Sequence, residues 1–356
     1  MKSRGFRARL EASLLRIWYG NAQPGMIAGL LLSLLEIVYK SLWHATRQSR
    51  KAENARKSTQ PPVLVVGNLI AGGAGKTPVV MAVCRHLSSR GLKAGIVSRG
   101  YGRNSQSTVL IDPAQPLPNA AEVGDEPLFL CQQTGCPVAV SRNRSHAVQQ
   151  LLQIFPDLDL IISDDGLQHH RLARQLEWVV FDERAQGNGR LLPAGPLREP
   201  ISRLASVDAV LCSNISAGWL ADRLGLPATH NWHEIRVQLE CFRHLKSGKV
   251  IDLEQARREW VLTPVAAFTG IANPDKLFTA LCDAGIKPEV RLGLPDHFSY
   301  PAGFCDQFSQ PVLITTGKDA VKLSHDNPAV WVAEIQLQLP PSLALALEEC
   351  IGSTTD

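Results

Sequence analysis

Short apolar runs alternate with amphipathic stretches over most of the chain after residue 62. The apolar runs are three to five residues long and rich in Val, Ile and Leu, which is typical of strands buried on both faces. Between several of them, apolar positions recur at helical spacing, as in residues 78–89 and 145–155. The runs that predict strands are residues 63–66, 94–97, 138–140, 158–162, 178–181 and 209–211. Strands that alternate with helices predict a mainly parallel sheet in a layered α/β fold.

The longest apolar run, residues 26–43, predicts a helix about 27 Å long, which is marginal for crossing a hydrocarbon core of about 30 Å. Its polar residues Ser33, Glu36 and Lys40 fall on one stripe, where Glu36 and Lys40 can pair. A basic, apolar stretch precedes it, with arginines at positions 4, 7, 9 and 16. The pattern favours a helix lying in a membrane interface over two helices packed on the protein's own core. The polar residues 47–60 predict a linker, and no cleavable signal peptide is expected.

The charge distribution supports this division of the chain. The net charge is +4, but residues 1–60 carry +8 and the remaining 296 residues carry −4. A slightly acidic body argues against a nucleic-acid partner, and a basic arm fits an anionic lipid surface. The eight cysteines include no CxxC pair, so we expect reduced thiols rather than disulfides or a metal–thiolate site.

A glycine-rich loop follows the first predicted strand, in the order VLVVGNLIAGGAGKTPVV. Gly72, Gly73 and Gly75 allow the backbone to curl around phosphate oxygens, and the following helix N-terminus favours an anion. Lys76 supplies a charge for the β- and γ-phosphates, and Thr77 supplies a hydroxyl for Mg²⁺. The strict phosphate-loop pattern has glycine where this chain has Ile70. The predicted nucleotide-binding residues are Ile70, Ala71, Gly72, Gly73, Ala74, Gly75, Lys76 and Thr77.

A second predicted strand ends in Asp164 and Asp165. A carboxylate at the end of an apolar strand is what a phosphate-loop site needs to hold Mg²⁺ directly or through water. The two side chains cannot both point the same way from one strand, so we expect one to face the metal and the other to orient the loop. The alternative is an ordinary solvated turn.

Further polar clusters follow other predicted strands, where α/β proteins place their sites. Each alone is compatible with an ordinary loop, but a phosphate site explains why Arg, Lys, Asp and His gather at several strand ends. These clusters are residues 98–103, 124–127, 192–200, 296–300 and 315–319.

Taken in order, these motifs closely resemble those of the tetraacyldisaccharide 4′-kinase family of lipid A biosynthesis. The resemblance extends from the N-terminal arm to about residue 335, and the family shares the non-standard phosphate loop. The motifs that carry it are VGNLxxGGxGKTP, SRGYGR, GDEP, DDGLQHHRL, LLPAGPLREP, DHFxY and TxKDAVK. The resemblance implies a phosphate-loop α/β/α domain with a second, smaller α/β domain and an N-terminal membrane-associated helix.

The resemblance also implies the reaction, which is transfer of the ATP γ-phosphate to the 4′-hydroxyl of an acylated glucosamine disaccharide 1-phosphate to form lipid IVA. Asp125 corresponds to the catalytic base and His297 to its partner. Lys76 and Arg198 balance charge on the migrating phosphoryl group, while Glu199 helps to close the site against water. The remaining implied contacts are Thr77, Asp164 and Asp165 with Mg²⁺, and Arg99 and Tyr101 with the lipid substrate.

The expected domains are an arm and linker over residues 1–60, a kinase domain over 61–245, a smaller domain over 246–345 and a tail over 346–356. The expected location is the cytoplasmic face of the inner membrane, with peripheral or monotopic attachment and no predicted protein partner. The alternative function is a membrane-associated phosphate-loop ATPase switch. Those switches usually carry a second lysine just before the two glycines, where this chain has Ala71.

Overall fold

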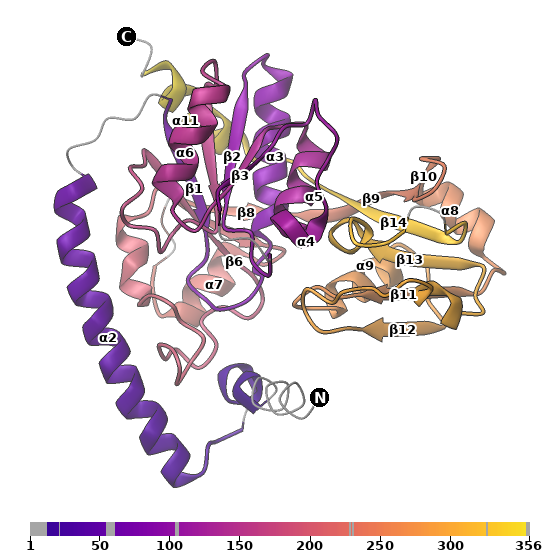
Figure 1. Ribbon diagram of the computed structural model, residues 1–356. Coiled ribbons are helices and arrows are strands. Elements are labelled where there is room, and N and C mark those ends of the chain that lie inside the picture. Colours follow the sequence, from indigo (N-terminus) through magenta and orange to yellow (C-terminus); the bar gives the residue numbers. More distant parts are fainter. Residues whose placement is uncertain are drawn as a thin grey trace. The chain divides into compact units, whose positions relative to one another are not determined.

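The protein is described by a computed structural model that covers residues 13–20, 22–54, 61–103, 107–227, 229, 231–324 and 327–353, without the side chains of residues 46–54 (Figure 1). The expected basic residues at positions 4, 7 and 9 lie outside the described residues. The chain divides into two compact units. The first unit comprises Met1–Lys76, Asp165–Ile235 and Leu345–Asp356, and the second comprises Thr77–Asp164 and Arg236–Ala344. The expected domain limits near residues 61, 245 and 345 stay predictions.

The first unit contains four parallel strands in the order β1, β6, β7, β8. Every residue of β1 and β7 is buried, which explains their unbroken runs of Val, Leu and Ala. The unit also contains the 3₁₀ helix η1 and the helix α7. The bounds are β1 (Val63–Gly67), β6 (Leu176–Phe181), β7 (Ala209–Ser213), β8 (Trp232–Ile235), η1 (Ile201–Ser206) and α7 (Ala217–Leu224).

The second unit contains strands in the order β3, β4, β2, β5, of which β3 alone is antiparallel to its neighbour. Strand β5 starts two residues later than expected, because the Asp159 carboxylate accepts a hydrogen bond from the Lys93 amide and pairing begins at Leu160. Asp164 is therefore the last residue of the strand. The bounds are β2 (Ala94–Ser98), β3 (Val109–Ile111), β4 (Val138–Val140), β5 (Leu160–Asp164), α3 (Lys76–Ser89), α4 (Ala120–Val123), α5 (Asp125–Thr134) and α6 (Arg144–Ile154).

The second unit also contains a six-stranded mixed sheet in the order β10, β9, β14, β13, β11, β12. Along β11, Val265 and Ala267 join one hydrophobic cluster whereas Ala266 and Phe268 join another, so each face of this sheet has its own core. Strand β9 is antiparallel to both of its neighbours, β10 and β14, whereas the other pairs of this sheet are parallel. The bounds are β9 (Val237–His244), β10 (Val250–Asp252), β11 (Val265–Thr269), β12 (Val290–Gly293), β13 (Val312–Thr316), β14 (Val330–Leu337), α8 (Leu253–Trp260), α9 (Asp275–Asp283), η2 (Phe304–Gln307) and α10 (Gly317–Ala320). The helix α11 (Pro341–Gly352) begins in the second unit and belongs to the first from Leu345 onward. The α/β fold class is confirmed, with more antiparallel pairing than the sequence predicted.

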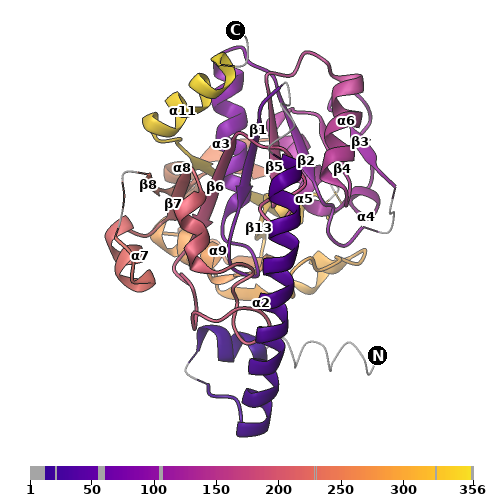
Figure 2. The ribbon, with the colours of Figure 1, turned by 90° about the vertical axis from the view of Figure 1, so that its left-hand side faces the viewer.

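The apolar arm forms one long helix, α2 (Met26–Asn54), drawn in indigo in Figures 1 and 2. It continues through residues 47–54, so the expected linker is wrong there: this stretch is rich in Arg, Lys, Ala, Gln and Glu, which favour helix. The stretch Met26–Ala45 is long and apolar enough to cross a membrane, a test that core helices and signal sequences also pass.

The polar stripe of α2 faces the protein, and its apolar residues face away. Glu36 accepts hydrogen bonds from the Leu191 amide (2.7 Å) and from the Arg190 guanidinium (2.6 Å), so it pairs with Arg190 rather than with Lys40. Tyr39 donates to the Arg198 carbonyl at 2.7 Å. The large apolar residues left exposed are Met26, Ile27, Leu30, Leu31, Leu34, Leu35, Ile37, Val38 and Leu42. In the described residues, the apolar face of α2 is therefore exposed and does not pack on the protein's own core.

Residues 13–19, which precede α2, are also helical and contact other parts of the first unit. The Trp18 indole donates to the Pro193 carbonyl at 3.0 Å, and the Tyr19 hydroxyl donates to the Ala71 carbonyl at 3.3 Å. The arm therefore reaches the glycine-rich loop directly.

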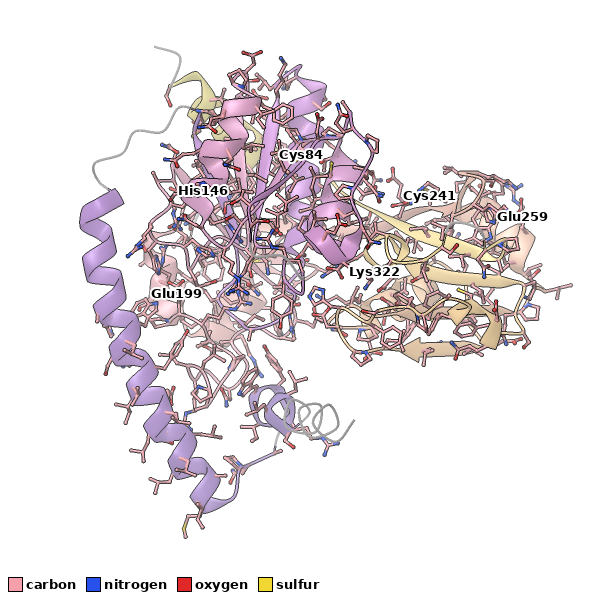
Figure 3. The ribbon with its side chains drawn as sticks, in the orientation of Figure 1. Cys84, His146, Glu199, Cys241, Glu259 and Lys322 are labelled. Carbon is pink, nitrogen blue, oxygen red and sulfur yellow. The ribbon has the colours of Figure 1, made fainter. Side chains whose placement is uncertain are left out.

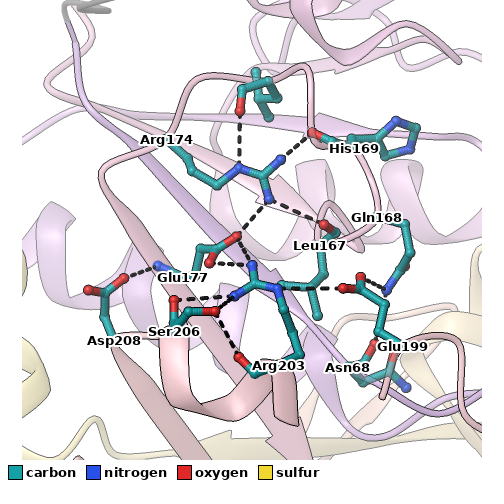
Figure 4. Close-up of polar contacts among 11 residues, drawn as sticks. Asn68, Leu167, Gln168, His169, Arg174, Glu177, Glu199, Arg203, Ser206 and Asp208 are labelled. Atoms are coloured by element: carbon teal, nitrogen blue, oxygen red, sulfur yellow. Dashed lines mark hydrogen bonds and ion pairs between the residues drawn. The ribbon is translucent and has the colours of Figure 1, made fainter. Parts of the chain in front are cut away.

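A buried charge network ties β6 to the loops of the first unit (Figure 4). Glu177 accepts hydrogen bonds from both Arg174 and Arg203, and all three side chains are at most 12% exposed. Arg174 also donates to the backbone carbonyls of Leu167 and His169. Glu177 thus fixes the loop that follows Asp165.

Replacing Glu177 by glutamine is expected to lower the free energy of unfolding by about 3–5 kcal/mol, because the buried Arg174 loses its ion pair and the buried Arg203 is left with Glu199 at 3.5 Å. Urea denaturation measures this change. The matched control is Glu254→Gln, whose partner Arg258 is largely exposed, and a change within about 0.5 kcal/mol is expected there. Equal unfolding midpoints for the two variants would contradict the role of the network.

Candidate active site

The glycine-rich loop connects β1 to α3 and is braced by an asparagine side chain. The Asn68 amide nitrogen donates to the carbonyls of Ile70 (2.8 Å) and Gly72 (2.9 Å), while its oxygen accepts from Lys76 Nζ at 3.2 Å. Gly72 and Gly75 have φ values of +95° and +86°, a region that L side chains rarely adopt. The loop therefore needs glycine at these two positions.

The structure explains why Ile70 replaces the usual glycine. Ile70 is fully buried, forms an isolated bridge with Leu197, and is not among the residues with positive φ. The next residue, Ala71, donates its amide to the Pro196 carbonyl at 2.8 Å. This position of the loop is therefore packed against residues 192–200, where an apolar side chain fits and no glycine conformation is required.

Lys76 and Arg198 converge on the carboxylate of Asp165. The distances to Asp165 Oδ1 are 3.3 Å from Lys76 Nζ and 3.0 Å from Arg198 Nη1. Burial opposes ionisation of Asp165, but the two positive charges outweigh it and hold the pKa of this carboxyl well below its usual range. Asp165 has a φ of 48°, an uncommon conformation that often marks functional sites. Two cations held in this way can stabilise the charge of a phosphoryl group.

Thr77 and Asp164 are the residues whose oxygen atoms suit Mg²⁺. The Thr77 hydroxyl donates to Glu126 Oε1 at 2.9 Å, and Asp164 at the end of β5 is 1% exposed. Across the described residues, no group of three or more His, Cys, Asp or Glu side chains forms a ready-made metal centre. Mg²⁺ prefers hard oxygen ligands and typically takes one or two from protein, with phosphate and water completing its shell. The residues therefore fit the ion, and the ion pairs of Asp165 with Lys76 and Arg198 favour it as the carboxylate that orients the loop.

Asp125 and His297 come together in the second unit, although 172 positions separate them in the chain. His297 Nδ1 lies 2.9 Å from both oxygens of Asp125, the first residue of α5. The His297 amide donates to the Gly270 carbonyl at 3.1 Å, and His297 has a φ of 59°. The Tyr101 ring lies 5.1 Å from the His297 ring and is 61% exposed.

The electrostatic surroundings favour the ion pair. Burial works against charge on Asp125, but the His297 hydrogen bond and the charges of Lys318 and Lys322 hold the pKa of the carboxyl well below its usual range. Burial likewise works against charge on His297, yet its hydrogen bond to Asp125 raises the pKa of the imidazole. A carboxylate hydrogen-bonded to an imidazole can accept a proton from a hydroxyl as its bond to phosphorus forms.

Comparison with known proteins identifies the family. A family model described as tetraacyldisaccharide-1-P 4′-kinase (LpxK) matches residues 28–352. The chain belongs to this family. Among relatives named tetraacyldisaccharide 4′-kinase, that of Acidovorax ebreus is 41% identical over 90% of this chain and 89% of its own length. That of Bordetella petrii is 38% identical over 88% and 89%.

A solved structure agrees with this membership. It is described as the "apo" form of LpxK from Aquifex aeolicus in complex with ATP. It is 25% identical to this chain, has a TM-score of 0.70, and covers 88% of this chain and 98% of its own. The predicted family, fold class and kinase identity are thereby confirmed.

In this kinase family member, Glu199, which is expected to help close the site against water, is an internal residue. Glu199 is fully buried, accepts from Gln168 Nε2 at 3.1 Å and lies 3.5 Å from Arg203 Nε (Figures 3 and 4). Gln168 in turn accepts a hydrogen bond from Arg198 at 3.3 Å. Glu199 is therefore connected to Arg198 through Gln168, and its role in closing the site stays a prediction.

Three residues of the site escaped the sequence analysis. Asn68 braces the glycine-rich loop, Gln168 joins Arg198 to Glu199, and Glu126 orients the Thr77 hydroxyl. All three stand inside quoted motifs, so their position next to chosen residues was the only available signal. Arg99 is exposed, and Arg99 and Tyr101 stay predictions as substrate contacts.

Proposed function

We propose that this kinase transfers the γ-phosphate of ATP to the 4′-hydroxyl of tetraacyldisaccharide 1-phosphate, producing lipid IVA at the cytoplasmic face of the inner membrane. The observation that carries the proposal is the hydrogen-bonded Asp125–His297 pair in a chain whose family acts as this kinase. A sugar hydroxyl is a weak nucleophile, so a positioned base and charge stabilisation are what the reaction requires.

In the proposed reaction, the glycine-rich loop binds the phosphates through its backbone amides and the N-terminus of α3. Lys76 and Arg198 stabilise the charge that develops on the transferred phosphoryl group. The chemistry that Mg²⁺ supplies when bound by Thr77 and Asp164 is neutralisation of phosphate charge. Asp165 keeps Lys76 and Arg198 in place, since it contacts both at 3.3 Å or less.

Residues of the second unit act on the sugar hydroxyl that accepts the phosphate. Asp125 takes the proton of the sugar 4′-hydroxyl as the hydroxyl oxygen bonds to the γ-phosphorus and ADP leaves, and His297 orients the carboxylate through its 2.9 Å contact. Tyr101, whose ring is tilted beside that of His297 and is largely exposed, offers a flat surface for a sugar ring. The exposed Arg99 offers a cation for the substrate's 1-phosphate.

The decisive test is lipid-dependent turnover. Detergent-solubilised protein, ATP and Mg²⁺ are mixed with increasing amounts of the acylated disaccharide 1-phosphate, and ADP and phosphorylated lipid are both measured. We expect ADP to appear only with lipid and in equal amount to the new phosphate ester. ATP turnover that is independent of the lipid would instead support the ATPase switch.

The exposed apolar face of α2 supports attachment to the membrane that contains this substrate. Its leucines are more than half exposed, while Ser33 and Glu36 hold the opposite face to Arg190. We propose that this face enters the lipid interface in the membrane plane, and that the basic residues around it bind anionic headgroups.

Deleting residues 1–45 is expected to release much of the protein from anionic vesicles. A less disruptive variant, Leu30→Asp with Leu34→Asp, should weaken vesicle binding at least about tenfold, because it removes two exposed leucines that would be buried in lipid. Sedimentation with vesicles measures binding, and circular dichroism measures folding.

The control for this pair is Leu262→Asp, which changes a 92% exposed leucine elsewhere in the chain and should leave vesicle binding unchanged. Unchanged binding of the double variant together with loss of the folded signal would instead favour packing of α2 on the protein's own core.

A further inference from the structure

The segment that follows β13 has no part in the reaction proposed above, yet it lies beside the catalytic pair. Thr316 caps α10, and the chain then continues to Lys322. Lys322 Nζ lies 3.3 Å from Asp125 Oδ2 and 3.2 Å from Asp319 Oδ1, and the Lys322 side chain is 11% exposed (Figure 3). One buried ammonium group therefore bridges two carboxylates, one of which is the proposed base.

Asp319 holds this ammonium group in a fixed place. Asp319 is fully buried, and its Oδ2 accepts hydrogen bonds from the hydroxyls of Thr269 (2.7 Å) and Thr316 (2.7 Å) and from the Gly270 amide (3.1 Å). Three donors on one oxygen leave Oδ1 directed to Lys322. The Tyr300 ring lies 5.3 Å from Lys322 Nζ and limits the space in which the ammonium group can move.

Gly270, just after β11, supports both ends of this arrangement. Its amide donates to Asp319, and its carbonyl accepts from the His297 amide. A Cβ on Gly270 would lie 3.1 Å from Phe298 Cβ and 3.3 Å from Asp319 Oδ1, so a larger residue would push the two ends apart. Gly270 therefore helps to hold both neighbours of the Asp125 carboxylate: His297 directly, and Lys322 through Asp319.

Lys322 is the cation in direct contact with Asp125, at 3.3 Å, and the charge of Lys318 also lowers the pKa of this carboxyl. Lys318 also lies nearby, but its Nζ is 3.7 Å from Glu126, which shares that charge. Lys322 instead contacts Asp125 and Asp319, and Asp319 is engaged by its own donors. The charged or titratable groups facing the Asp125–His297 pair are Glu126, Asp296, Lys318, Asp319, Lys322 and Tyr101.

We propose that Lys322, anchored by Asp319, is a positioning residue that keeps the Asp125 carboxylate ionised and aligned with His297 Nδ1. This role rests on the proposed function, because it acts through the catalytic pair. It involves no contact with substrate or nucleotide. Loss of the ammonium group raises the proton affinity of the pair, so the pair becomes protonated, and inactive as a base, at a higher pH.

The test compares kcat/KM against pH for lipid phosphorylation by the full-length protein and four variants. Lys322→Met is expected to lower kcat/KM at neutral pH about 10- to 100-fold. The acidic limb of its pH profile, where kcat/KM falls as the pH is lowered, should move to higher pH by about one unit or more. Lys322→Arg keeps the charge and should return the limb to its wild-type position. Binding of ATP should be unchanged throughout. Lys249→Met, in an exposed ion pair, is the control and should behave as wild type.

The double variant Lys322→Met with Asp319→Asn separates positioning from folding. It leaves no unpaired buried carboxylate at position 319, so its melting temperature should recover relative to Lys322→Met, while its acidic limb stays shifted. Recovery of wild-type kcat/KM and pH profile in the double variant would overturn the proposal, as would an unshifted limb in Lys322→Met. Absence of lipid phosphorylation by the wild-type protein would contradict the proposed function and this role together.

Discussion

Replacing Asp125 by asparagine is expected to lower kcat about 10²- to 10⁴-fold, the usual contribution of general acid–base catalysis. The amide keeps the shape of the side chain, yet it cannot accept the proton of the sugar hydroxyl or balance the charge of His297. Its place as the first residue of α5 and its contact with Lys322 should be preserved. The expected loss is therefore chemical, with little change in the KM for ATP.

The measurement is the steady-state rate of lipid phosphorylation, together with binding of a fluorescent ATP analogue. The matched control is Asp283→Asn, an exposed aspartate at the end of α9, which should retain wild-type rates. A normal kcat in Asp125→Asn would remove this residue from its role as base, whereas lost nucleotide binding would indicate a folding defect instead.

Replacing Lys76 by methionine is expected to lower kcat about 10²- to 10³-fold, comparable to the loss of one preorganised donor to a developing charge. Methionine keeps much of the length and apolar body of the side chain, but it removes the cation that contacts Asn68 and Asp165. Arg198 then remains as the partner of Asp165 at 3.0 Å, so the fold of this region should survive. ATP binding is expected to weaken as well, because the loop loses its phosphate-directed charge.

Rates and nucleotide affinity are measured as for Asp125, and the melting temperature is recorded alongside. Lys93→Met is the control, since the Lys93 side chain is 66% exposed and its ion pair with the exposed Asp157 is long, at 3.9 Å. Wild-type turnover in Lys76→Met would contradict the assignment of the glycine-rich loop as the phosphate site.

The local parts of the site could be predicted from sequence because they depend on consecutive residues. The glycines at positions 72 and 75, the lysine and threonine after them, and an aspartate at a strand end each have a physical reason that a short segment contains. The strands at residues 63–66 and 138–140 are likewise predictable, since a strand that is buried on both faces has an unbroken apolar run in its own sequence. Strands β9 and β14, which pair antiparallel with each other, are missed because many of their residues are only partly buried and several carry polar side chains.

Other features depend on residues that are distant in the chain. The sequence determined that α2 carries a polar stripe opposite an apolar face, because helical periodicity alone fixes that. Only the tertiary structure decided that the stripe contacts Arg190 and the apolar face stays exposed. The same holds for Glu199, whose hydrogen bond with Gln168, 31 positions away, no local pattern could reveal.

The sequence by itself determined the chemical groups of this kinase and, through their order, its family. The tertiary structure alone decided which groups meet: Asp125 with His297 across 172 positions, Asp165 with Lys76 and Arg198, and Lys322 with Asp125. The physical reason is that the protonation and orientation of a carboxylate depend on charges within a few ångströms. Those distances are set by packing of whole sheets and loops, whereas a motif specifies only its own short segment.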